Sequence, residues 1–147
     1  MSGGLSILAV ALSGYLTVTH YTDPSTLACP DVGIINCSAV TTSSWSVIFG
    51  VPVALLGLLW AVGMTALNSP WAWRSLARWT NRARLAMSGI GAVVVVYLVF
   101  IELFRVDAIC LWCTGVHLIA LALFAVILVA QATRSKVGKQ SRRRTPG

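Results

Sequence analysis

Four long stretches of apolar residues constrain this chain more than any other feature of its sequence. They run from about Leu5 to Tyr21, Val47 to Leu67, Leu85 to Phe104 and Cys110 to Ala130. A helix needs about 20 residues to cross the hydrocarbon core of a bilayer, and each stretch approaches or reaches that length. Lipid offers no partners for unpaired backbone groups, so such stretches cross as helices rather than as open sheets. The sequence therefore predicts an all-α integral membrane protein, a bundle of four transmembrane helices.

The composition supports this class and excludes two others. Hydrophobic residues make up 57% of the 147 residues and charged residues only 10%, and the mean hydropathy is +0.82. A water-soluble domain of this size has too little interior to bury so many apolar side chains. A disordered chain would be polar and rich in charge. Both classes are therefore excluded.

The basic residues predict how the chain is oriented in the membrane. Ten of the 11 lysines and arginines fall between the second and third stretches or after the fourth; they are Arg74, Arg78, Arg82, Arg84, Arg134, Lys136, Lys139, Arg142, Arg143 and Arg144. The positive-inside rule places both of these segments, and both termini, in the cytoplasm. The loop 22–46, between the first two helices, and the short turn 105–109 then face outward. We expect a multi-pass protein of the cell membrane.

Two further expectations concern the ends of the chain. The first stretch lacks the basic residues and the cleavage site of a signal peptide, so we expect it to remain as a helix. Residues 1–133 are expected to form the four-span domain and residues 134–147 a basic cytoplasmic tail. Such a tail fits anionic lipid head groups of the bilayer. Nucleic-acid binding would need stacking aromatics beside the basic residues, so we expect no nucleic-acid partner.

All four cysteines fall on the predicted outer face, where disulfides persist. Cys29 and Cys37 lie in the loop 22–46, and Cys110 and Cys113 form a C-x-x-C where the fourth helix begins. A C-x-x-C at a helix N-terminus lowers the pKa of a thiol and favours disulfide exchange. A disulfide between Cys29 and Cys37 would be local and exposed, and so able to exchange with a protein thiol. This spacing favours a redox site.

Two alternatives remain open at this point. Structural disulfides could staple the outer loop, although a disulfide within one helical turn closes a loop too small to stabilise the fold much. Four thiolates could also hold zinc or copper, but zinc sites usually carry a short spacing in both halves, and only one half has it here. We therefore expect redox chemistry and no metal.

The same residues resemble the vitamin K epoxide reductase family of bacterial thiol–quinone oxidoreductases. The resemblance rests on the segment Cys29–Ser38, which reads CPDVGIINCS, on Ser43 and Trp45, on Phe49-Gly50, and on the C-x-x-C at the last helix. It covers nearly the whole chain. Another four-span disulfide generator, the DsbB type, carries its C-x-x-C in the first outer loop and its spaced pair in the second. The order here is the reverse, as in the vitamin K epoxide reductase family.

The resemblance implies an electron relay. A secreted thioredoxin-fold (DsbA-like) protein would reduce the Cys29–Cys37 disulfide, with Cys29 as the outer contact. Cys37 would then attack Cys110, and Cys113 would pass electrons to a membrane quinone of the menaquinone or ubiquinone type. Each exchange needs an in-line sulfur, so the segment Cys29–Asn36 is expected to be mobile.

The resemblance also implies which residues contact the quinone. His117 lies one helical turn after Cys113, at a position where vertebrate relatives have a tyrosine; its alternative role is a histidine tied to Thr114. Ser46 stands where those relatives have an asparagine, and Ser43 matches a family hydroxyl. The other expected contacts are Phe49 and Trp112. Ser43 could instead cap the next helix, and the aromatics could instead anchor the membrane interface.

One acidic residue at the end of the third stretch has a simpler interpretation. Glu102 and Arg105 are three residues apart, which predicts an ion pair at the end of that helix. Two other functions stay open for the protein as a whole. It could be a true quinone-epoxide reductase, or a non-enzymatic membrane subunit that binds thiols or metal.

Overall fold

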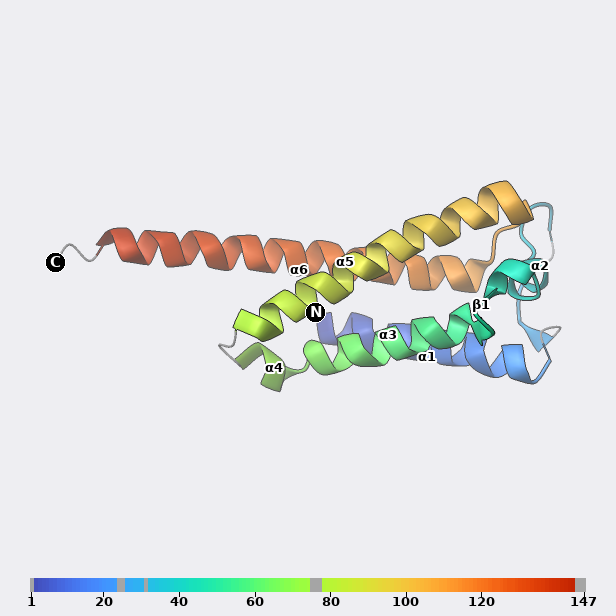
Figure 1. Ribbon diagram of the computed structural model, residues 1–147, viewed down its shortest axis with the longest axis horizontal. Coiled ribbons are helices and arrows are strands. Elements are labelled where there is room, and N and C mark those ends of the chain that lie inside the picture. The colour runs from blue at the N-terminus through green and yellow to red at the C-terminus, as the bar shows by residue number, and fades with distance from the viewer. Residues whose placement is uncertain (1, 24–25, 31, 75–77, 145–147) are drawn as a thin grey trace.

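The computed structural model describes residues 2–23, 26–30, 32–74 and 78–144, and its long elements are all helices (Figure 1). In chain order the elements are α1 (Ser2–Tyr21), α2 (Cys37–Thr41), η2 (Ser44–Ser46), β1 (Val47–Ile48), β2 (Val51–Pro52), α3 (Val53–Leu67), α4 (Pro70–Arg74), α5 (Arg78–Ile101), η3 (Glu102–Val106) and α6 (Leu111–Arg144). Helix α1 packs against α3 and α6, and α5 packs against α6 and α3. In the part described, three helices are long and apolar enough to cross a membrane: Ser2–Tyr21, Trp79–Val106 and Leu111–Arg134. These helices indicate an all-α membrane protein.

The second predicted span differs from the structure at its start. Residues 47–52 form a short antiparallel hairpin, with Val47 opposite Pro52, instead of the first turns of a helix. Phe49 and Gly50 both adopt positive φ angles, 51° and 81°, which makes the turn tight. Pro52 then stands at the N-cap of α3, where its missing N–H costs no hydrogen bond. Helix α3 is therefore only 15 residues long, and a fourth crossing stays a prediction.

Arg84, which the sequence places between the second and third apolar stretches, is buried within α5. Only 1% of its surface is exposed. Its guanidinium donates to the Leu67 carbonyl at the end of α3, with N···O distances of 3.0 and 2.6 Å, and to Asn81 Oδ1 at 3.0 Å. The last carbonyls of a helix lack partners within the helix. Arg84 therefore ties the end of α3 to α5.

The two ends of the bundle carry different segments. The loop that follows α1, together with α2 and the hairpin, lies at one end, and α4 lies at the other (Figure 1). Helix α6 begins beside α2 and extends past α4 toward the C-terminus, so the predicted tail 134–147 continues this helix as far as Arg144. This separation agrees with the predicted placement of the cysteines and the arginine-rich connector on opposite sides. Which end faces the cytoplasm stays a prediction.

Candidate functional site

The four cysteines lie together at one end of the bundle. Cys37 and Cys110 are 2% and 0% exposed and share one apolar cluster with two leucines of α1 and the following loop, and Cys29 and Cys113 pack against that cluster. Cys29 and Cys37 form a disulfide with a Cα–Cα distance of 6.1 Å. Cys110 and Cys113 are free thiols. An oxidised pair thus lies beside a reduced pair. These four cysteines form the cysteine cluster.

Backbone hydrogen bonds hold the loop over the second pair. The N–H of Ile109 donates to the Ile34 carbonyl at 2.8 Å, and the N–H of Asn36 donates to the Ile109 carbonyl at 3.1 Å. Ile109 immediately precedes Cys110, and Asn36 immediately precedes Cys37. This pairing of backbones brings two cysteines that are far apart in the sequence into one cluster. The structure shows the loop docked, and its movement stays a prediction.

Local sequence signals explain how each cysteine reaches this position. Asn36 caps α2, because its Oδ1 accepts the N–H of Ala39 at 2.8 Å, so Cys37 opens that helix. On the other side, α5 ends in the π-helical turn η3, and Asp107 then adopts a left-handed conformation with φ 51°. This reversal brings the chain back to begin α6 just after Cys110. Single π-helical turns often mark functional sites.

The Cys110 thiol has a favourable environment for ionisation. Its pKa is lowered, chiefly because the Cys113 thiol donates a hydrogen bond to it. The backbone N–H of Cys113 also points at the Cys110 sulfur, at 3.3 Å. Burial and the charge of Glu102 oppose this shift but do not cancel it. Of the two thiols in the reduced pair, Cys110 is therefore the one that ionises more readily.

Replacing Cys113 with alanine should move this titration to higher pH. The substitution removes the hydrogen bond that contributes most to lowering the Cys110 pKa, while burial, which raises it, remains. Thiolate absorbance, recorded in a background in which Cys29 and Cys37 are both replaced by alanine so that Cys110 has no loop disulfide to attack, should then appear only at higher pH than in the same background with Cys113 present. Leu118→Ala, at an exposed position of the same helix, serves as the control. An unchanged or lower titration in Cys113→Ala would contradict this account.

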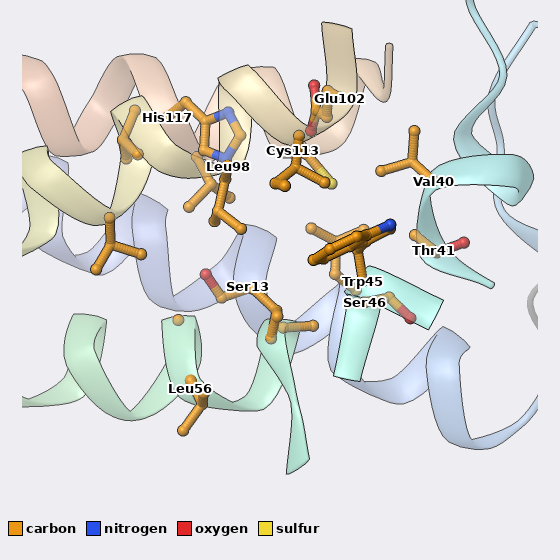
Figure 2. Close-up of a pocket in the computed structure, with 18 of the residues that line it drawn as sticks. Ser13, Val40, Thr41, Trp45, Ser46, Leu56, Leu98, Glu102, Cys113 and His117 are labelled. Atoms are coloured by element: carbon orange, nitrogen blue, oxygen red, sulfur yellow. The ribbon is translucent and has the colours of Figure 1, made fainter. Parts of the chain in front are cut away.

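A cavity of about 380 Å³ opens beside the cysteine cluster (Figure 2). Most of its walls are apolar side chains from α1, α3, α5 and α6, and the segment from α2 to η2 closes one side. Cys113 lines it, as do Glu102, His117 and Trp45. Figure 2 shows the Trp45 ring between Cys113 and Ser46. The volume and the apolar lining suit a small flat ligand.

The structure brings three of the five predicted quinone contacts to this cavity. His117, Ser43 and Ser46 line it. Phe49 does not, because it is fully exposed at the tip of the hairpin turn. Trp112 does not either, because its indole N–H donates to the Ala28 carbonyl at 2.9 Å, outside the cavity. Asp31, part of the motif in the loop, lies outside the described residues.

Two buried polar atoms of the cavity wall lack hydrogen-bond partners within the part of the chain that the structure describes. They are Nδ1 of His117 and Oγ of Ser13. A third such atom, Oδ1 of Asn68, belongs to a residue that does not line the cavity. The alternative role for His117, a tie to Thr114, is not observed, since the Thr114 hydroxyl donates to the Cys110 carbonyl instead. Unpaired buried polar groups are costly unless a ligand or water satisfies them. A ligand with two polar ends would satisfy both.

The predicted ion pair between Glu102 and Arg105 is absent from the described part of the structure. The Arg105 guanidinium lies over the Trp45 ring, 5.8 Å from its centroid. Glu102 instead turns inward and is 7% exposed. The reason is the π-helical turn, which changes the angle between residues that an α-helix would place on one face. The sequence did not single out Ser13 or Glu102 as site residues, although each is a polar residue within an apolar stretch.

Fold and site together define an all-α membrane protein with a disulfide, two thiols and an apolar cavity at one end of its helices. The sequence matches the model of the vitamin K epoxide reductase family over residues 1–128. The chain belongs to this family. Membership implies oxidoreductase activity of the thiol–quinone or epoxide type, and the disulfide beside two further cysteines fits it. Family members in general use quinones.

Proposed function

We propose that this protein is a membrane disulfide generator, which passes electrons from a secreted thioredoxin-fold (DsbA-like) protein through its four cysteines to a membrane quinone. One observation carries the proposal. Both cysteine pairs share one cluster, and the cavity reaches that cluster at Cys113. Thiol exchange and quinone reduction could therefore follow each other without large movement of the helices. The cysteine end of the bundle would face the outside of the cell.

The exposure of the loop disulfide suggests where electrons enter. Cys29 is half-buried, whereas Cys37 is almost fully buried. A thiolate of the partner protein would attack the sulfur of Cys29, and the Cys37 thiolate would leave. A second thiol of the partner would then attack its own sulfur in the mixed disulfide, which releases Cys29. The partner leaves oxidised, and the loop pair is reduced by two electrons.

Transfer to the second pair repeats the same chemistry. The Cys37 thiolate attacks Cys110 of an oxidised Cys110–Cys113 pair, and Cys113 leaves as a thiolate. Cys29 then attacks Cys37, restores the loop disulfide and releases Cys110. The result is an oxidised loop pair and a reduced C-x-x-C, which is the pairing in the structure. Cys110 suits the role of the attacked sulfur and later leaving group, because its lowered pKa favours departure as a thiolate.

The cavity residues suit a quinone. A bound quinone supplies an acceptor for two electrons and two protons. His117 and Ser13 carry the unpaired polar atoms that would hydrogen-bond its oxygens, and apolar side chains would hold its ring in place of water. Cys113 lines the same cavity, where it can meet the ring. The type of quinone, menaquinone or ubiquinone, would depend on these walls.

Substitution of the two polar residues should weaken quinone binding. His117→Phe and Ser13→Ala each remove one hydrogen bond of about 1–1.5 kcal/mol, so each should raise the KM for quinone about tenfold. The rate of thiol exchange with the partner should stay the same, because neither residue lies in the cysteine cluster. Steady-state kinetics with varied quinone checks this, with Leu118→Ala as the control. An unchanged KM in both variants would exclude them as contacts.

Quinone reduction by the purified protein in detergent, driven by a reduced DsbA-like protein, tests the proposed function. Sustained quinol formation is the expected result. No turnover with several quinones, together with stoichiometric metal bound by the thiols, would favour the metal-binding subunit instead. The described residues contain no group of three or more His, Cys, Asp or Glu side chains that could hold a metal ion.

The same preparation tests the second enzymatic alternative. Ser46 and His117 stand where vertebrate relatives have an asparagine and a tyrosine. We therefore expect little turnover of a quinone epoxide in an assay driven by a dithiol. Epoxide turnover as fast as quinone reduction would make epoxide reduction the preferred assignment.

A further inference from the structure

Glu102 is a carboxyl group buried where the proposed relay does not yet use it. It is 7% exposed, and in the part of the chain that the structure describes it forms no ion pair with a lysine or arginine. Moving an unpaired carboxylate away from water costs several kcal/mol, and ionisable residues at membrane depth are usually functional. Because burying this carboxyl group destabilises the fold, we expect it to have a role in the site.

Three observations place this carboxyl group beside the reduced cysteine pair. The backbone N–H of Cys110 donates a hydrogen bond to it. Its charge lies close enough to interact with the thiols of both Cys110 and Cys113. Glu102 and Cys113 also line the same cavity, and Figure 2 shows them next to each other at one side of it. The carboxyl group therefore lies between the reduced pair and the space proposed for the quinone.

Oxidation of the dithiol must move protons as well as electrons. When the Cys110–Cys113 bond forms, two electrons leave the sulfurs, and the Cys113 thiol gives up its proton. The quinone named above takes both electrons and needs two protons, one on each oxygen, to become a quinol. The wall of the cavity is mostly apolar, so few of the groups in it can accept a proton. Among the described residues that line the cavity, Glu102 is the one with a carboxyl group, and its charge acts on both thiols.

We propose that Glu102 is the proton carrier of this reaction, taking the proton from the Cys113 thiol and delivering it to a quinone oxygen. Its position depends on the π-helical turn at Glu102–Val106, which turns the side chain inward. The second proton is the one that the Cys110 thiol releases to solvent when it ionises, and it returns from solvent to the other quinone oxygen. This inference rests on the proposed function, since it assumes that a quinone oxidises the pair.

The test is single-turnover oxidation of the reduced protein by quinone, compared between the wild type and Glu102→Gln. Glutamine keeps the size and polarity of the side chain but cannot carry the proton. We expect the rate of quinol formation to fall about 100-fold, while the quinone dissociation constant, measured by tryptophan fluorescence on protein with both pairs oxidised, stays within about twofold. Glu102→Asp should restore part of the rate. Equal rates in the wild type and Glu102→Gln would overturn the proposal, as would a parallel loss of quinone affinity.

A second readout needs no quinone. The charge of Glu102 raises the Cys110 pKa, so in Glu102→Gln the thiolate absorbance should appear at lower pH than in the wild type. The substitution leaves the other titratable or charged groups on the surrounding elements unchanged. They are Cys113 and His117 on α6, Arg105 on η3, Asp107 in the turn after it, and His20 on α1. An unchanged titration would mean that no carboxylate acts on the pair, and would overturn the proposal even if the wild type failed to reduce quinone. Absence of quinol from the wild type would contradict the proposed function, whereas wild-type turnover with equal rates in Glu102→Gln would contradict only this inference.

Discussion

Replacing Cys113 with alanine should abolish quinone reduction and leave the two cysteine pairs joined to each other. Cys113 is the one cysteine that lines the cavity, so no other sulfur can meet a ring bound there. The rate should fall below detection. Production of quinol from a reduced DsbA-like protein measures it directly.

The same variant should also accumulate a covalent intermediate. Without Cys113, Cys110 cannot form its own disulfide, so its thiolate should attack Cys37 of the loop disulfide, its neighbour in the cysteine cluster, and release Cys29 as a thiolate. Peptide mapping under non-reducing conditions identifies that bond. Leu118→Ala, exposed on the same helix, should behave as the wild type in both assays. Sustained quinol formation by Cys113→Ala would contradict the relay.

The class of fold could be predicted from the sequence because the length of an apolar stretch is a local property. The first, third and fourth apolar stretches correspond to the three long helices, with ends displaced by a few residues. The second does not, because apolar length alone cannot separate a strand from a helix. The positive φ angles of Phe49 and Gly50 and the position of Pro52 at the N-cap explain why helix α3 begins six residues later than predicted.

The candidate site was only partly predictable, since it depends on which residues meet in space. The four cysteines stood out through their spacing and their place at helix ends. His117 was found by its helical distance from Cys113, and it does line the cavity. Ser13 lies a hundred residues away on another helix, so no spacing could join it to this site. Glu102 was misread because a regular helix was assumed where the chain forms a π-helical turn.

Replacing Cys29 with serine should block electron transfer from the partner protein and leave the quinone step intact. The proposed partner attacks Cys29, the more exposed sulfur of the loop disulfide, so reduction of quinone by the DsbA-like protein should be lost. Dithiothreitol is small enough to reduce the Cys110–Cys113 pair through the cavity, so quinone reduction driven by dithiothreitol should be retained. The ratio of the two rates measures the effect. Val32→Ala, an exposed position in the same loop, is the matched control.

These two assays also distinguish a redox-active loop disulfide from a disulfide that only stabilises the loop. A disulfide that only stabilises the loop would constrain its unfolded chain, and its loss would lower the melting temperature. Both reactions would then decline together in Cys29→Ser as the fold weakened. A relay predicts the opposite pattern, in which only the reaction with the protein partner is lost while dithiothreitol still drives the quinone step. Since the backbone of Ile109 binds the loop on either side of Ile35 without help from the disulfide, the cluster should keep its arrangement in the variant.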